Sequence, residues 1–94
     1  MKLFIDTSSS EKIVIKIDGK RFETDARIKK AQSLLPFIVE TLEKEGKKIE
    51  DITEVEVCPG PGSFTGLRVG AAVGNALAWS LRIPILLDKL RYVS

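Results

Sequence analysis

The chain has 94 residues, enough for one small domain and too few for a second independent core. Its 15 lysines and arginines against 13 aspartates and glutamates give a net charge of +2, too small by itself to indicate nucleic-acid binding. There is no histidine and one cysteine, Cys58, which excludes the usual zinc sites, Ser-His-Asp triads, Cys-His dyads and an intramolecular disulfide. Without a signal peptide or a membrane-length apolar run, we expect a cytoplasmic protein that does not enter a membrane.

The first part of the chain predicts a three-stranded meander. Residues 3–6 form a short apolar strand, and residues 12–17 alternate between isoleucine and mainly lysine, as a half-buried strand does. Asp18-Gly19 supplies a two-residue hairpin turn, because both positions of such a turn favour positive φ. Residues 20–24 then return as the partner strand.

Between residues 27 and 45 the apolar period becomes helical, and Gly46 is placed to end the helix. Pro36 is the awkward residue, because proline in a helix interior costs about 3 kcal/mol. We therefore expect this helix to start late, with Gln32 or Ser33 near its N-cap. The apolar stripe consists of Ile28, Ala31, Leu34 or Leu35, Ile38 and Leu42.

The second part of the chain predicts two strands around a second helix. Residues 53–58 form a strand, and the Gly/Pro run at 59–62 breaks it sharply. Ser63 or Thr65 caps a helix that reaches about residue 81, and residues 83–87 form a fifth strand. Residues 88–94 are ambiguous and could begin another helix. The order β-β-β-α-β-α-β predicts an α/β domain with a mixed five-stranded sheet, as in ribonuclease-H-like domains.

The turn within residues 58–70 leads from a strand directly into a helix, whose N-terminus could hold an anion. A tight structural connection is the alternative. Pro59 and Pro61 remove two N–H donors, and Leu67-Arg68 stands where a Walker motif has Lys-Ser or Lys-Thr. These departures favour the structural interpretation.

Nucleotide or dinucleotide binding is the rival function for the same turn. Gly60, Gly62 and Gly66 follow a strand and open a helix, and Asp88 stands where a ribose-binding acid belongs. The glycine spacing is one residue too long, however, and a β-hairpin does not begin a Rossmann domain. This function therefore remains the alternative.

Few other residues suggest chemistry. Asp6-Thr7-Ser8 could ligate magnesium or phosphate, but a hard-cation site usually needs more than one carboxylate, so a polar turn is favoured. Cys58 is interpreted as an inert buried thiol, and Trp79 as a packing residue. No nucleophile with a base can be assembled, so we expect no catalytic residue, no metal and no cofactor.

The second predicted helix is apolar nearly all round. Between residues 67 and 81 only Arg68, Asn75 and Ser80 are polar, and such a helix must be covered on most sides. Gly66, Gly70 and Gly74 stand four apart and form a flat strip, although each glycine costs about 1 kcal/mol against alanine in a helix. Packing on the chain's own sheet explains part of this strip, and a protein partner is the best explanation for the rest.

The eleven residues 60–70, Gly-Pro-Gly-Ser-Phe-Thr-Gly-Leu-Arg-Val-Gly, resemble the signature of the TsaB/YeaZ family. Asp6-Thr7-Ser8, Leu34-Leu35-Pro36, Ala76-Leu77-Ala78 and Ile83-Pro84 match the family as well, so the resemblance covers nearly the whole chain. The signature turn comprises Gly60, Pro61, Gly62, Ser63, Phe64 and Thr65.

The resemblance implies an actin/Hsp70-like fold and a non-catalytic partner of the transferase TsaD, which attaches threonylcarbamoyl groups to tRNA beside the ATPase TsaE and the synthase TsaC. The two helices would form a four-helix interface with TsaD, or with a second copy in its absence, and tRNA would be contacted only indirectly. Asp6, Thr7 and Ser8 would be a vestigial phosphate loop. The implied partner interface comprises Leu34, Leu35, Ile38, Leu42, Gly66, Arg68, Gly70, Val73, Gly74 and Leu77.

Three departures from the family pattern limit what carries over. The catalytic paralogue has a His-x-x-x-His metal pair just after the strand ending in Ile-Pro, and residues 87–93 contain none. Lys30 stands near a place where relatives often have histidine. The family continues into a second similar domain, whereas this chain stops at Ser94, so we expect one N-terminal domain without an interdomain nucleotide cleft. Alone, it should neither bind ATP nor catalyse the transfer.

Overall fold

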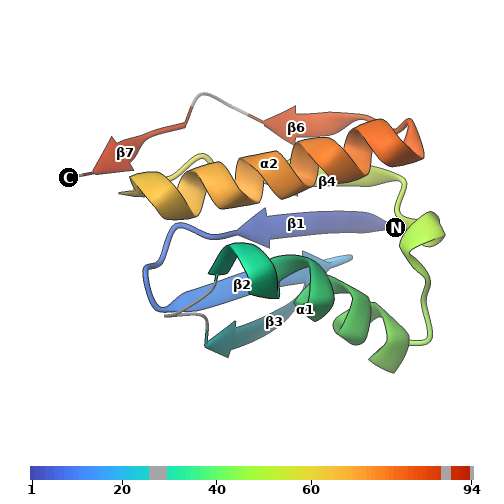
Figure 1. Ribbon diagram of the computed structural model, residues 1–94. Helices are drawn as coiled ribbons and strands as arrows, with labels where there is room; N and C mark the ends of the chain where they lie inside the picture. Colours follow the sequence, from blue (N-terminus) through green and yellow to red (C-terminus); the bar gives the residue numbers. More distant parts are fainter. Residues whose placement is uncertain (26–29, 88–89, 94) are drawn as a thin grey trace.

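The computed structural model describes residues 1–25, 30–87 and 90–93 (Figure 1). Seven strands, two α-helices and one 3-10 turn follow one another in these ranges. Their order is β1 (Lys2–Asp6), β2 (Lys12–Ile17), β3 (Lys20–Asp25), α1 (Lys30–Lys44), η1 (Ile49–Asp51), β4 (Glu54–Val57), β5 (Gly62–Ser63), α2 (Phe64–Leu81), β6 (Ile85–Leu87) and β7 (Tyr92–Val93).

Five strands form the predicted mixed sheet, in the order β3-β2-β1-β4-β6. The first three strands pair antiparallel, while β4 pairs parallel with β1 and β6 parallel with β4. Asp18 and Gly19 form the hairpin turn with φ values of 50° and 87°, as predicted. The hairpin register places Ile15 opposite Phe22, which directs the alternating isoleucines of β2 toward the helices.

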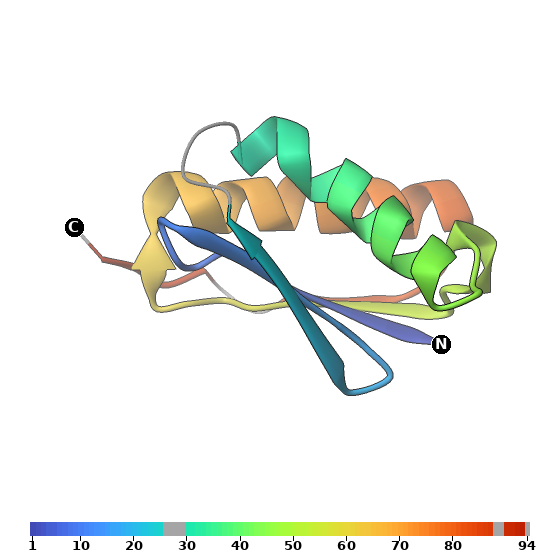
Figure 2. The ribbon, with the colours of Figure 1, turned by 90° about the horizontal axis from the view of Figure 1, so that it is seen from below.

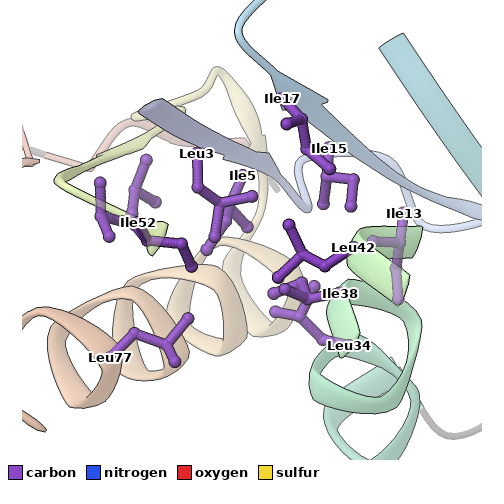
Figure 3. Close-up of a cluster of buried hydrophobic side chains, with 12 residues drawn as sticks. Leu3, Ile5, Ile13, Ile15, Ile17, Leu34, Ile38, Leu42, Ile52 and Leu77 are labelled. Atoms are coloured by element: carbon purple, nitrogen blue, oxygen red, sulfur yellow. The ribbon is translucent and has the colours of Figure 1, made fainter. Parts of the chain in front are cut away.

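Both helices lie side by side on one face of the sheet (Figure 2). The core fills the space between these two layers (Figure 3). The opposite face carries lysines and glutamates, and the Lys2 ammonium lies 2.5 Å from the Glu56 carboxylate and 3.8 Å from that of Glu54. The domain therefore has one buried and one charged sheet face. The core side chains are Leu3, Ile5, Ile13, Ile15, Ile17, Leu34, Ile38, Leu42, Ile52, Val55, Val57 and Leu77.

The first helix begins earlier than predicted, at Lys30, and holds Pro36 in its interior. The expected late start near Gln32 or Ser33 was wrong. Pro36 lies on the exposed side of the helix, while Leu34 and Ile38 are fully buried against the sheet, and this burial outweighs the local cost of the proline. Residues 27–29 lie outside the described residues.

The helix ends as expected. Gly46 has a φ of 71°, and the Lys47 N–H donates to the Leu42 carbonyl at 2.8 Å, which satisfies one of the last free carbonyls of α1.

The end of the chain, which the sequence left ambiguous, contains a short strand. Tyr92–Val93 forms β7, which pairs in parallel with Gly62–Ser63 of β5, a second small sheet that the sequence did not predict. The fifth strand begins at Ile85, directly after Pro84, because proline has no N–H to donate to a neighbouring strand. Neither of the two described helices combines the length and hydropathy of a membrane span.

Candidate functional site

The signature turn connects β4 to α2 and is packed too tightly for side chains at its glycines. Gly60 has a φ of 105°, a conformation that L residues rarely adopt. A Cβ atom on Gly62 would lie 2.7 Å from the Ser8 Cα, so only glycine fits beside the loop after β1. Ser63 is the N-cap of α2, and its hydroxyl accepts a hydrogen bond from the Gly66 N–H at 3.1 Å.

Two N–H groups of this turn that could bind a phosphate donate to carbonyls within the chain. The Gly62 N–H donates to the Arg91 carbonyl at 3.2 Å, and the Ser63 N–H donates to the Ser8 carbonyl at 3.2 Å. In return, the Arg91 N–H donates to the carbonyl of Pro59 in the turn at 2.6 Å. The geometry thus favours a structural connection over nucleotide or dinucleotide binding. The ribose-binding candidate Asp88 lies outside the described residues.

Asp6, Thr7 and Ser8 form a self-contained polar turn at the end of β1. The Asp6 carboxylate accepts hydrogen bonds from the Ser8 N–H at 2.9 Å and from the Ser8 hydroxyl at 2.6 Å. Thr7 is buried and donates its hydroxyl proton to the Gly66 carbonyl in α2. Among the described residues no three His, Cys, Asp or Glu side chains gather into a metal-binding group. These contacts favour the polar-turn interpretation.

Cys58 lies half-buried at the end of β4, near this turn. Burial raises the pKa of the Cys58 thiol, and the nearby Asp6 carboxylate raises that pKa further, because both disfavour a thiolate. The side chain is therefore a protonated thiol at neutral pH and a poor nucleophile. This geometry agrees with the inert thiol that the sequence suggests.

Alkylation should make this protonation visible. We expect the rate at which iodoacetamide modifies Cys58 to rise with pH around a midpoint above 9.0, the ordinary pKa of the thiol. Asp6→Asn should lower that midpoint because it removes a neighbouring negative charge, while Asp18→Asn, in the distant hairpin turn, should leave it unchanged. A native midpoint equal to that of the chain in guanidinium chloride would contradict the prediction.

The structure buries most of the residues that were expected at a partner interface. From α1, Leu34, Ile38 and Leu42 point into the chain's own core. From α2, a Cβ on Gly74 would lie 2.6 Å from the Val57 Cγ2, and one on Gly70 would collide with the Thr7 hydroxyl. The glycine strip therefore lets α2 approach its own sheet and is not a contact surface for a partner. Gly66 and Leu77 are buried with it.

A different set of side chains covers the outer face of the helix layer, on the side away from the sheet. Of the expected interface residues, Leu35 is 43% exposed, Arg68 is exposed and Val73 is half-buried. We define the outer helix face as Leu35, Val39, Phe64, Arg68, Ala72, Val73, Ala76 and Trp79.

Trp79 was interpreted as a packing residue, and within this chain its side chain is 84% exposed. The spacing of residues along the helix could have predicted that Trp79 lies on the exposed side. Trp79 follows Arg68 by eleven positions and Ala72 by seven, so these three residues share one helical stripe. That stripe lies opposite the glycines that contact the sheet.

Known proteins match this chain both in sequence and in fold. A family model described as TsaD: tRNA N6-adenosine threonylcarbamoyltransferase matches residues 24–87. The tRNA threonylcarbamoyladenosine biosynthesis protein TsaB of Bacillus subtilis (strain 168) is 50% identical over 36 residues, covering 38% of this chain and 16% of that protein. The TsaB of Escherichia coli (strain K12) is 34% identical over 55 residues, covering 58% of this chain and 24% of that protein.

A solved structure extends the match to almost the whole chain. The structure of YeaZ from Pseudomonas aeruginosa superposes with a TM-score of 0.75 at 29% identity, covering 94% of this chain and 42% of that one. The chain thus spans less than half the length of this relative. The predicted ribonuclease-H-like, actin-like fold is confirmed, with the mixed sheet and two helices in the expected arrangement.

Proposed function

Because this chain belongs to the family of tRNA N6-adenosine threonylcarbamoyltransferase, and within it resembles the TsaB/YeaZ proteins, we propose that it supports the biosynthesis of threonylcarbamoyladenosine in tRNA. In this proposal the chain is a partner subunit of a TsaD-like transferase and not a catalyst. It acts in the cytoplasm, beside a TsaE-like ATPase, and meets tRNA only through the complex.

The observation that carries the proposal is an apolar surface on the outer side of both helices of a TsaB-like fold. Phe64 is 51% exposed, Trp79 is more exposed still, and α1 adds the exposed side chains Leu35 and Val39. Aromatic and aliphatic side chains that gather on one face mark a protein contact surface. In this proposal the partner interface is the outer helix face, in place of the mostly buried residues that the sequence predicted.

The non-catalytic part of the proposal rests on the residues of the chain. It contains no histidine, so the metal pair of the catalytic paralogue has no counterpart. The backbone donors of Gly62 and Ser63 already have partners inside the protein. These properties support a role in stabilising a transferase rather than in its chemistry.

Nucleoside analysis tests this function. Depleting the gene product in its host should lower threonylcarbamoyladenosine in total tRNA to a small fraction of its normal level, measured by mass spectrometry of digested tRNA. The parent chain should restore it, whereas Val39→Asp should not, because a carboxylate on this face is costly to desolvate when a partner covers it.

The control is Leu86→Asp, which places the same charge on the opposite, charged face of the sheet at a side chain that is 51% exposed. This variant should restore the nucleoside as the parent does. An unchanged nucleoside level after depletion would refute the pathway, and equal failure of both variants would refute the outer helix face as the interface.

A further inference from the structure

The five-stranded sheet has two outer edges, and the two differ in chemistry. At one edge, four of the six residues of β3 are charged, a pattern that discourages pairing with another strand. At the other edge, β6 consists of Ile85, Leu86 and Leu87 and carries no charge. Among the described strands β6 pairs with β4 alone, and Figure 1 shows it at the margin of the sheet. This second edge is therefore open to an added strand.

The backbone of β6 presents hydrogen-bonding groups on its outer side. The Val55 N–H of β4 donates to the Pro84 carbonyl at 3.2 Å, which fixes the phase of this parallel ladder. Alternate residues of a strand direct their backbone groups to opposite sides, so Leu86 faces β4, whereas Ile85 and Leu87 face away from it. Because Pro84 faces β4 as well, its missing N–H does not interrupt the outer side. The N–H and carbonyl groups of Ile85 and Leu87 are thus directed outward.

A hollow lies on each side of the sheet beside this edge. One, of about 470 Å³, is lined by Glu56 and Leu86, whose side chains lie on the charged face. The other, of about 730 Å³, lies between the end of α2 and β6 and is lined by Trp79, Arg82 and Ile85. A strand added to β6 would direct alternate side chains to the two sides, so each hollow would receive every second residue.

The charges beside the two hollows differ in sign. On the charged face, Leu86 pairs in register with Glu56, and Lys2 is bound by both Glu54 and Glu56, so one ammonium and two carboxylates leave a net charge of −1. A lysine or arginine there would cover the exposed Leu86 with its aliphatic stem and direct its charge toward Glu56. On the helix side, Arg82 repels a second cation, while neighbouring apolar side chains suit an uncharged residue.

We infer that β6 binds an extended segment of a partner protein as a sixth strand, in which basic side chains on the charged face alternate with apolar side chains on the helix side. Backbone hydrogen bonds to Ile85 and Leu87 hold the segment, and the two hollows select its pattern. The sheet edge shares only Trp79 with the outer helix face. The inference therefore goes beyond the proposed function and does not depend on it.

Hydrogen exchange at single amides, measured by NMR, tests the inference with the synthetic peptide acetyl-Val-Lys-Val-Lys-Val-amide. At about ten times its dissociation constant, the peptide should slow exchange of the Ile85 and Leu87 N–H groups about tenfold, because exchange then requires the free edge. The amides of β3, at the opposite edge, should keep their exchange rates. The emission of Trp79, the single tryptophan, should change along the same titration.

Variant peptides separate a strand ladder from simple charge attraction. The peptide acetyl-Val-Glu-Val-Glu-Val-amide should bind about tenfold more weakly or worse, because its carboxylates meet those of Glu54 and Glu56. N-methylation of alternate residues should abolish binding for one alternate set and spare the other, since only one edge of the peptide faces β6. In the protein, Glu56→Gln should weaken the lysine peptide about two- to fivefold, whereas Glu43→Gln, on the exposed side of α1, should not.

Three results would overturn the inference. They are unchanged exchange at Ile85 and Leu87 at every peptide concentration, equal binding of the two N-methylated peptides, and equal binding of the lysine and glutamate peptides. Protection of these amides that grows with protein concentration, without any peptide, would assign the edge to a second copy and refute the partner segment. Each of these results would leave the proposed function intact, because threonylcarbamoyladenosine levels test that function separately.

Discussion

Replacing Gly74 by leucine should destabilise the domain itself by about 3 kcal/mol or more. Even the first added carbon would lie 2.6 Å from the Val57 Cγ2 and 3.4 Å from the Ile85 Cδ1, in a layer that has no room for it. Overpacking of this kind costs about 1–3 kcal/mol for a few methylene groups, and leucine adds a whole side chain. The gain of about 1 kcal/mol in helix propensity does not offset that cost.

Urea denaturation of the dilute chain measures this effect through the free energy of unfolding. The matched control is Ala76→Leu, which adds a leucine side chain to the exposed side of the same helix and should change stability by about 0.5 kcal/mol or less. A Gly74→Leu chain that unfolds at the parent's urea concentration but no longer associates would contradict the structure. It would restore the glycine strip as a surface for a partner.

Truncating Ile38 to alanine should cost about 2–5 kcal/mol of stability, the usual range for a fully buried isoleucine. Ile38 is the central residue of the inward stripe of α1, between Leu34 and Leu42, and the three together hold this helix on the sheet (Figure 3). In a domain of this size such a loss is a large share of the total stability. Much of the chain should therefore be unfolded at physiological temperature.

The neighbouring residue provides the control. Val39→Ala, one position along the same helix on its outer side, should change the free energy of unfolding by only about 0.5 kcal/mol. Thermal unfolding followed by circular dichroism compares the two variants under one condition. Equal losses in both variants would mean that α1 presents a different side to the sheet.

The sequence by itself determined the elements whose signal is local. The alternation at residues 12–17 and the Asp18-Gly19 turn predicted the hairpin. A strand with one buried face and a turn that needs positive φ each require a characteristic pattern of residue types. Gly46 predicted the end of α1 for the same reason. The signature at residues 60–70 led to the family, and two of its glycines, Gly62 and Gly70, proved to stand where a side chain would collide with the loop after β1.

Only the tertiary structure decided which surface each helix stripe faces. Periodicity shows that Gly66, Gly70 and Gly74 share one side of α2. It does not show whether the chain's own sheet or a partner protein packs against that side. Since α2 is apolar on both sides, hydropathy did not separate the buried glycine strip from the exposed stripe of Trp79.

Two further features depended on contacts between residues distant in the chain. Pro36 remains inside α1 because Leu34 and Ile38 pack on strands from the first part of the sequence. Helix propensities describe single residues and do not include this packing energy. Likewise, Tyr92–Val93 becomes a strand because the signature turn, thirty residues earlier, offers its backbone as a pairing edge. Local sequence determines which backbone conformations have low free energy, and long-range packing selects among them.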